Sequence, residues 1–408
     1  MRRIFWALSL AVLVAAAAVV VMAQGPPPDS KAWIHIPDST IQHLADIGVR
    51  AHTNHLIRVS RKPAPPPSEP KGMYPATLWS YYVESSENEH LAAGSKVIAI
   101  VDAYHYPTAL NDFNYFSGQF NLPKETSTNA LADTNNVFRV VYGTKTGKAP
   151  RTNCGWAQEA ALDIEWAHAM APNAKIILVE AATNSFADLF YAVNVATDLV
   201  AKAGGGQVSM SWGGSEFSTE ATYDGYFTSS SSVVYFASSG DIGGKTIYPS
   251  VSPYVVAAGG TTLVFDANKN IVSETGWSGS GGGVSAYEPK PTYQIGISLI
   301  DSDYRGVPDI SFDADPNTGV AVYDSTSCQG YVGWMVFGGT SVSAPALAGL
   351  TNSAGGFAAD SASQLASSYT YPGFFNDIIG GTAGDYTAIE GWDFVTGLGT
   401  PNRLAGLK

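Results

Sequence analysis

Five short apolar runs along the chain predict strands that are buried on both faces. They cover residues 97–101, 175–179, 207–211, 233–237 and 254–258, and they are bounded by Gly, Pro or Ser. Continuous apolar runs of this length are typical of strands inside a parallel sheet, because helices cover both faces of such a sheet. We therefore expect a central sheet that is mostly parallel.

Helical stretches fall between most of these runs. Residues 157–169 are rich in alanine, residues 186–203 follow the second run, and residues 341–353 are rich in small residues. Strands that alternate with helices predict one α/β domain with a doubly wound, mostly parallel sheet and helices on both faces. We expect this domain to span residues 73–408, with its ligands beyond the carboxyl ends of the strands.

The first 72 residues follow a different pattern. Residues 1–23 contain two arginines and then a mostly apolar run that ends in Val-Met-Ala, which predicts a secretory signal peptide and a secreted protein. The alternative is an uncleaved membrane anchor, since roughly 18 to 20 apolar residues can span a bilayer. Residues 24–72 contain two proline clusters and little periodic apolar pattern, and predict a linker or a short pro-segment.

The composition predicts a large hydrophobic core and an acidic protein. The chain has 408 residues, 45% of them hydrophobic, and a formal charge of -13. Such a charge repels phosphate backbones and anionic membranes, so nucleic acid is excluded as an expected partner. The two cysteines, Cys154 and Cys328, either form a disulfide or remain as two buried thiols, because the sequence does not give their separation.

A glycine-rich turn that leads into a helix carries the strongest candidate nucleophile. Residues 337–345 read Phe-Gly-Gly-Thr-Ser-Val-Ser-Ala-Pro, which places Ser341 at the start of the helix. Glycines allow close approach of the backbone to a substrate, and the free amides at a helix N-terminus stabilise negative charge. Ser341 is therefore well placed to attack a carbonyl group. The alternative is an ordinary N-capping serine.

Two carboxylates lie four residues apart in the alanine-rich helix. Glu159 and Asp163 would project from one face, about one turn apart, where they can share a proton or a hydrogen bond. The alternative is a pair of ordinary surface acids, and the neighbouring Glu165 is expected to be solvated. His168 lies in an apolar setting without glycine, so we expect it to be packed or at the surface.

The segment around Ser341 resembles the nucleophile motif that subtilisins and sedolisins share, Gly-Thr-Ser followed by Ala-Pro. A subtilisin would need a histidine as its base, and Asp102 and His168 occur in the corresponding order. None of the seven histidines, however, lies in the glycine-containing motif that such a base has. A histidine-dependent subtilisin-like peptidase is therefore one alternative, and a non-catalytic peptide-binding protein on the same scaffold is another.

Several further motifs resemble those of the sedolisin family, the serine-carboxyl peptidases. Glu159 and Asp163 are similar to the family's general base and its orienting partner, and residues 236–243 resemble the segment that carries an oxyanion-hole aspartate, here Asp241. Residues 208–216 resemble its substrate-binding strand, which would contact substrate through Ser211, Trp212, Gly213 and Gly214. The resemblance implies a monomeric serine-type peptidase with a subtilisin-like fold that acts on protein or peptide substrates.

Glycine-rich loops near the C-terminus resemble the sedolisin calcium site. Calcium prefers six or more oxygen ligands, which carboxylates and backbone carbonyls can supply together. The resemblance implies one Ca2+ ion held by the side chains of Asp377 and Asp393 and by the carbonyls of Ile378, Ile389 and Gly391. Ile389 stands where the family usually has glycine, and the alternative is a surface loop with incidental acids.

The resemblance also implies activity in acid. Ser341 would pass its proton to Glu159 as it attacks the peptide carbonyl, while the Ser341 amide and a protonated Asp241 would stabilise the oxyanion. Asp241 must keep its proton while Glu159 accepts one, and an apolar surround raises a carboxyl pKa above the usual value of about 3.9. We therefore expect peptidase activity that peaks well below about pH 7.

Overall fold

A computed structural model describes residues 32–59, 69–355 and 360–408 of the chain. The expected signal peptide and both proline clusters lie outside these described residues. Within the described ranges, no helix is long and apolar enough to cross a membrane.

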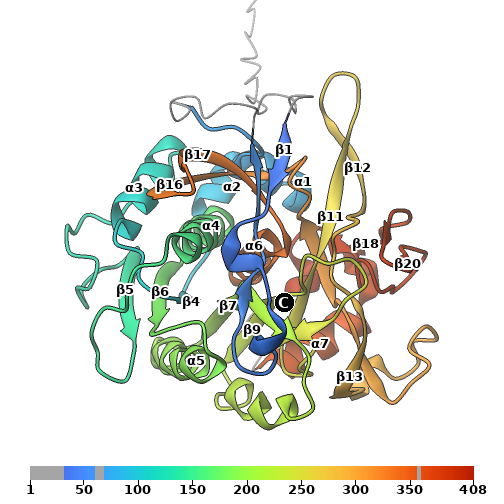
Figure 1. The fold of residues 1–408 in the computed structure, drawn as a ribbon. Coiled ribbons are helices and arrows are strands. Elements are labelled where there is room, and N and C mark those ends of the chain that lie inside the picture. The colour runs from blue at the N-terminus through green and yellow to red at the C-terminus, as the bar shows by residue number, and fades with distance from the viewer. Residues whose placement is uncertain (1–31, 60–68, 356–359) are drawn as a thin grey trace, which may run out of the picture.

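An eight-stranded sheet forms the centre of the molecule, in the order β12-β11-β9-β7-β4-β6-β5, with β15 beside β11 (Figure 1). Its neighbouring strands are parallel except for the pair β11 and β12. Five of its strands correspond to the five predicted runs, so the expected doubly wound α/β fold is confirmed. The eight strands are β4 (Val97–Ala103), β5 (Phe138–Gly143), β6 (Lys175–Ala181), β7 (Gly206–Met210), β9 (Val233–Ser238), β11 (Val256–Phe265), β12 (Ile271–Gly276) and β15 (Ile310–Asp313).

Helices cover both faces of this sheet. On β4, Ile98 and Ile100 point into a core that includes α4 and α6, whereas Val97 and Val101 point into a second core that includes α5. All four side chains are buried, which explains why the strand reads as a continuous apolar run. The helices are α1 (Pro75–Val83), α2 (Glu87–Ala92), α3 (Ala109–Gln119), α4 (Cys154–Met170), α5 (Phe186–Lys202), α6 (Thr340–Ser353) and α7 (Ser361–Thr370).

Residues 32–59 are built into this fold. Strand β1 (Trp33–His35) pairs with β3 (Leu56–Val59), and β3 pairs with β17 (Tyr331–Gly338), whose other neighbour is β16 (Val320–Cys328). Ile57 on β3 is fully buried in the main core. For residues 32–59 the linker prediction is therefore wrong, because these residues contribute strands and core side chains. The pro-segment alternative stays a prediction.

Short strand pairs complete the molecule. Strand β8 (Trp212–Ser215) lies between β2 (His52–Thr53) and β10 (Ile247–Tyr248), and both pairings are antiparallel. The other pairs are β13 (Gly283–Pro289) with β14 (Tyr304–Val307), β18 (Phe375–Asn376) with β21 (Thr400–Pro401), and β19 (Thr382–Ala383) with β20 (Tyr386–Thr387).

One disulfide joins Cys154 at the start of α4 to Cys328 at the end of β16. The two residues are 174 positions apart in the sequence, so the bond closes a long loop. In the chain-entropy account a loop of this size stabilises a fold by about 4 to 5 kcal/mol. The alternative of two free thiols is wrong.

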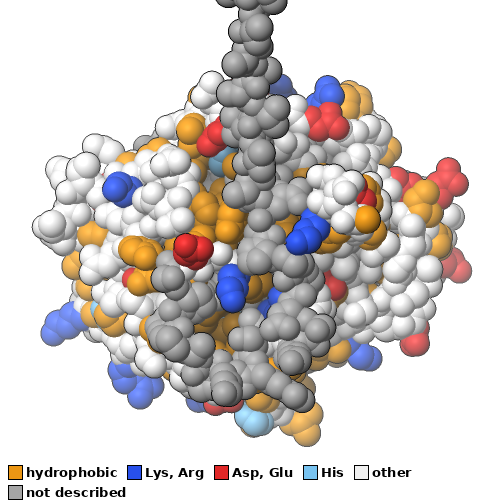
Figure 2. Space-filling view, turned by 90° about the horizontal axis from the view of Figure 1, so that it is seen from above, with side chains coloured by type: hydrophobic (Ala, Val, Ile, Leu, Met, Phe, Trp, Pro, Cys, Tyr) orange, Lys and Arg blue, Asp and Glu red, His pale blue; other side chains and the backbone are white. Residues whose placement is uncertain are grey.

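Charged side chains are scattered singly over the described part of the face shown in Figure 2. Lysine and arginine side chains lie among aspartate, glutamate and hydrophobic ones, so the net charge of -13 is not gathered there into one acidic patch. This face therefore offers no concentrated acidic field to an oppositely charged partner.

Candidate active site

Ser341 is the second residue of α6, directly after the turn that ends β17. Gly339 in that turn has a φ of 95°. A β-carbon on Gly339 would lie 2.3 Å from the Asn54 carbonyl oxygen and 2.4 Å from Asp241 Oδ2, so only glycine fits this position. The backbone N–H of Ser341 has no partner within the helix and donates to the Asn54 carbonyl oxygen at 3.0 Å.

The two carboxylates on α4 are completely buried where α4 packs against α6. Glu159 Oε2 accepts a hydrogen bond from the Asn54 N–H at 3.2 Å and lies 2.8 Å from His55 Nδ1. Both oxygens of Asp163 are buried without a geometric hydrogen-bond partner among the described residues. The alternative of exposed surface acids is therefore wrong for Glu159 and Asp163, which have no exposed surface.

Burial controls the ionisation of both carboxyls. It raises the pKa of Glu159 well above its usual value, and hydrogen bonds from Ser341 and from the Asn54 amide offset part of this effect. Burial also raises the pKa of Asp163, to which the nearby Asp102 and Glu159 add like-charge repulsion. Because like charges repel, the ionisation of one of these carboxyls favours the neutral form of its neighbours.

Asp241 lies on the other side of the Ser341 turn. Its Oδ1 atom accepts hydrogen bonds from the Thr340 N–H at 2.7 Å and from the Thr340 hydroxyl at 2.9 Å. Its Oδ2 atom is buried without a hydrogen-bond partner among the described residues and lies close to the Asn54 carbonyl, beside Gly339. Burial raises the pKa of Asp241 to about 8. The carboxyl is therefore neutral in acid, and Oδ2 is the oxygen free to carry the proton.

The predicted substrate-binding residues form β8 and the residue before it. Ser211 accepts a hydrogen bond from the Ser341 hydroxyl through its carbonyl oxygen at 3.3 Å. The Trp212 ring is buried in the core and donates to the Val101 carbonyl at 2.7 Å, so Trp212 offers its backbone to this edge. Gly213 lies opposite His52 in β2, and Gly214 lies opposite Tyr248 in β10.

Two other expectations have clear outcomes. Glu165, expected to be solvated, is fully buried and accepts a hydrogen bond from the Tyr323 N–H at 3.0 Å. The prediction for Glu165 is wrong because α4 is enclosed on all sides, with 16 of its residues buried. His168 is packed as expected, with Nε2 placed 2.9 Å from the Pro123 carbonyl oxygen.

Sequence reasoning missed Asn54, which contacts Ser341 and Glu159, and His55, which contacts Glu159. They lie in the stretch interpreted as a linker or pro-segment. The signal that could have placed them is the next four residues, Leu56–Val59, where buried positions alternate with partly exposed ones as in a half-buried strand.

The C-terminal loops bring the two predicted calcium carboxylates to the same short segment. Asp377 Oδ2 accepts the Gly391 N–H at 2.9 Å, and Asp393 Oδ2 accepts the Ile389 N–H at 3.1 Å. Among the described residues, no group of three or more His, Cys, Asp or Glu side chains is arranged to hold a metal ion. Two carboxylates and backbone carbonyls, including that of Ile378, remain a chemically suitable oxygen set for a hard cation.

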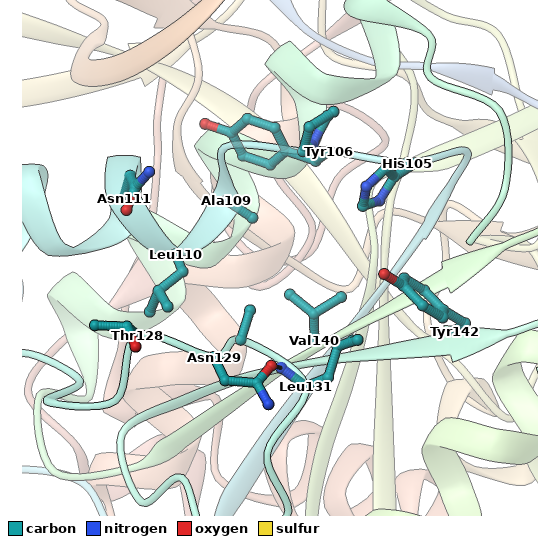
Figure 3. Close-up of a pocket in the computed structure, with 12 residues that line it drawn as sticks. His105, Tyr106, Ala109, Leu110, Asn111, Thr128, Asn129, Leu131, Val140 and Tyr142 are labelled. Atoms are coloured by element: carbon teal, nitrogen blue, oxygen red, sulfur yellow. Dashed lines mark hydrogen bonds between the residues drawn. The ribbon is translucent and has the colours of Figure 1, made fainter. Parts of the chain in front are cut away.

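A separate pocket of about 270 Å³ opens beyond β4 and β5 (Figure 3). His105 and Tyr142 line one part of it, with Leu110 and Val140 nearby. His105 Nδ1 lies 2.7 Å from Glu180 Oε2. The lining includes none of the predicted site residues, so this pocket is distinct from the candidate active site.

The fold and the site together define a subtilisin-like α/β protein in which a serine lies among buried carboxylates. No protein-family model matches the chain. Kumamolisin from Bacillus sp. (strain MN-32) is 35% identical over 284 residues, which are 60% of this chain and 49% of kumamolisin. Sedolisin from Pseudomonas sp. (strain 101) is 35% identical over 175 residues, which are 38% of this chain and 28% of sedolisin.

The structural comparison agrees with these sequence matches. A structure of Pseudomonas sedolisin, a serine-carboxyl proteinase, superimposes with a TM-score of 0.67 at 24% identity and covers 82% of this chain and 96% of that chain. The predicted resemblance to the sedolisin family, with its subtilisin-like fold, is therefore confirmed. The chain spans about half the length of kumamolisin and less than a third of that of sedolisin.

The buried carboxyls predict a fold that is most stable in acid. Burial raises the pKa of Asp241 to about 8 and that of Glu220 to about 9. Between the unfolded value near 4 and these values the folded state holds more protons, so the free energy of unfolding falls as pH rises through this range. Two buried histidines act oppositely below about pH 6.5, since burial lowers the pKa of His55 to about 3 and that of His168 to about 4.

Thermal melts between about pH 4 and pH 9 test this balance. We expect the melting temperature to decline above about pH 6, because each raised pKa unit costs about 1.4 kcal/mol once the carboxyl must ionise. Asp241→Asn should flatten part of the decline. A melting temperature that stays constant or rises towards pH 9 would contradict the prediction.

Proposed function

We propose that this protein is a secreted serine-carboxyl peptidase that hydrolyses peptide bonds of protein or peptide substrates in acid and acts as a monomer. The observation that carries the proposal is the set of groups around the backbone carbonyl of Asn54. The Asn54 carbonyl oxygen accepts the Ser341 N–H at 3.0 Å and lies beside Asp241 Oδ2, while the next residue contacts Glu159. A substrate carbonyl in this position would meet a nucleophile, a base and two oxyanion donors.

The reaction follows from these positions. Ser341 Oγ attacks the carbonyl carbon as its proton passes to Glu159, and the Ser341 amide with the Asp241 carboxyl stabilises the oxyanion. Glu159 then protonates the departing amine, and water hydrolyses the resulting ester. Burial and the neighbouring Asp102 and Glu159 carboxyls raise the pKa of Asp163, so Asp163 stays neutral and adds no second negative charge that would oppose the ionisation of Glu159.

Digestion of a denatured protein at several pH values tests the proposal, with the cleavage sites read by mass spectrometry. We expect cleavage with a maximum below about pH 7 and a loss above about pH 8, where Asp241 gives up its proton. A maximum near pH ~8 would favour the histidine-dependent alternative. Absence of cleavage at every pH would favour a non-catalytic peptide-binding protein.

We further propose that the C-terminal loops bind one calcium ion through Asp377, Asp393 and the carbonyls of Ile378, Ile389 and Gly391. Support comes from the convergence of both carboxylates on residues 389–391. Burial raises the pKa of Asp393 although the amides of Ile389, Val395 and Thr396 donate to its carboxyl, and a bound cation would favour the ionised form further.

Chelation should therefore lower the melting temperature by roughly 5 °C, since a ligand at a hundredfold its Kd stabilises by about 2.7 kcal/mol. Added calcium should restore the melt. Asp377→Asn should remove the response to chelator, whereas Asp385→Asn, an exposed acid in the neighbouring turn, should keep it. An unchanged melt of the parent in chelator would contradict the site.

A further inference from the structure

Two consecutive amides at the start of α6 donate to different acceptors. The Ser341 N–H donates to the Asn54 carbonyl oxygen at 3.0 Å, whereas the Thr340 N–H donates to Asp241 Oδ1 at 2.7 Å. Both amides belong to the first turn of the helix, where no earlier carbonyl of the helix can accept them. Thr340 therefore joins the helix that carries the candidate nucleophile to the Asp241 carboxyl.

The Thr340 side chain makes a second hydrogen bond to the same oxygen. Its hydroxyl oxygen accepts the Gly240 N–H at 3.0 Å and lies 2.9 Å from Asp241 Oδ1. A backbone N–H can only donate, and a hydroxyl has one proton to donate. The proton of this fully buried hydroxyl therefore goes to Oδ1, which is the acceptor within its reach.

These two bonds decide which oxygen of Asp241 carries the proton when the carboxyl is neutral. Oδ1 accepts two hydrogen bonds from Thr340, and a proton on Oδ1 would displace one of them and leave a buried donor without a partner. Oδ2 accepts none from the described residues and is buried beside Gly339. The neutral carboxyl therefore presents its O–H from Oδ2, next to the turn that leads to Ser341.

The same contacts affect how readily the carboxyl ionises. Burial raises the pKa of Asp241 to about 8, the two Thr340 hydrogen bonds offset part of this rise, and the charge of Glu159 on α4 adds to it. His55 lies beside the same turn, but burial lowers its pKa to about 3, so it stays neutral while Asp241 titrates. Removal of the Thr340 hydroxyl would therefore raise the pKa of Asp241 without a change in a neighbouring charge.

We propose that Thr340 is a positioning residue for the oxyanion donor: its amide and hydroxyl hold Asp241 Oδ1, so that Oδ2 carries the proton and donates a hydrogen bond to the oxyanion. This inference rests on the proposed function, because it takes Asp241 as an oxyanion donor. The two residues of the Thr-Ser pair then have separate tasks. Ser341 forms the bond to the substrate, and Thr340 orients the group that stabilises the resulting charge.

Thr340→Val tests this role, because valine keeps the branched shape of threonine and removes the hydroxyl. The proton can then lie on either oxygen of Asp241 and the carboxyl can rotate, so kcat should fall about three- to tenfold in acid with KM unchanged. The ionised carboxyl also loses a hydrogen bond, so the alkaline decline of kcat/KM should move up by about one pH unit. Thr340→Ser keeps the hydroxyl and should restore both properties.

Thr351→Val is the matched control, because Thr351 is equally buried in α6 and its hydroxyl has no hydrogen-bond partner among the described residues. Its pH profile should equal that of the parent. Melting temperatures check the folding of each variant, and Thr340→Ala, which also lacks the hydroxyl, replaces the valine variant if that variant does not fold. A profile of Thr340→Val that is lower at every pH but not shifted, or that equals the parent's, would overturn the proposal.

A titration without substrate separates this proposal from the proposed function. The readout is the NMR shift of the carboxyl carbons of labelled aspartate in Ser341→Ala protein, with the Asp241 signal assigned by its absence from Asp241→Asn. Thr340→Val should raise the Asp241 midpoint by about one pH unit. A raised midpoint beside a parent that hydrolyses no peptide would keep the hold of Thr340 on Asp241 and reject the peptidase. An unchanged midpoint beside an active parent would keep the peptidase and reject the role of Thr340.

Discussion

Ser341→Ala should lower kcat by roughly six orders of magnitude, the loss expected when a nucleophile that works with its base is removed. The fold should persist, because the change deletes one oxygen atom and leaves the turn at Gly339 intact. Initial rates in acid, compared with those of the parent, measure the effect. Activity that survives the change would exclude Ser341 as the nucleophile.

The carboxylates on α4 should follow a graded order. Glu159→Gln should be nearly as severe as Ser341→Ala, because no proton acceptor remains, whereas Asp163→Asn should retain more activity if it only orients and shares a proton. Glu165→Gln is the matched control, since Glu165 is equally buried on the same helix but contacts the Tyr323 amide. Equal rates in all variants and the parent would refute the assignment.

Asp241→Ala should reduce kcat/KM about a hundred- to a thousandfold at every pH, which is the usual loss when one oxyanion donor is removed. The Oδ2 atom beside the Asn54 carbonyl marks where that donor acts. Asp241→Asn keeps an N–H donor whatever the pH, so it should retain more activity than the alanine variant.

The pH profile separates this role from a structural one. The parent should lose activity as pH rises through about 8, where the Asp241 proton is lost, and Asp241→Asn should lack this decline. If Asp241 only accepts the Thr340 hydrogen bonds, both variants should show similar modest losses with parallel profiles. Profiles of kcat/KM against pH for the three proteins distinguish the two cases.

Much of the fold could be predicted from the sequence, because strand burial, helix spacing and tight turns depend on neighbouring residues. Strand β4 is covered on both faces, so all seven of its residues are buried and its apolar run is continuous. The spacing of Glu159 and Asp163 predicts a shared helix face, because side chains four residues apart lie one turn apart. The left-handed turn at Gly339 likewise follows from the run of glycines before Ser341.

Burial was harder to read, because it depends on what the rest of the chain places around a residue. Glu165 looks like a surface acid in a small-residue helix, and only the enclosure of α4 shows that it is not. The raised pKa of Asp241 has the same origin, since its carboxyl is desolvated by elements far away in the sequence.

The sequence by itself determined the α/β class, the order of the strands along the chain, the likeness to sedolisins and the candidate serine and carboxylates. The tertiary structure decided that Cys154 and Cys328 form a disulfide and that residues 52–55 lie against Ser341 and Glu159. Both depend on contacts between residues more than 100 positions apart in the sequence, such as Asn54 and Glu159, which are 105 positions apart. Residue spacing does not predict such contacts, because they depend on the pairing of β3 with β17, which places residues 52–55 next to Ser341.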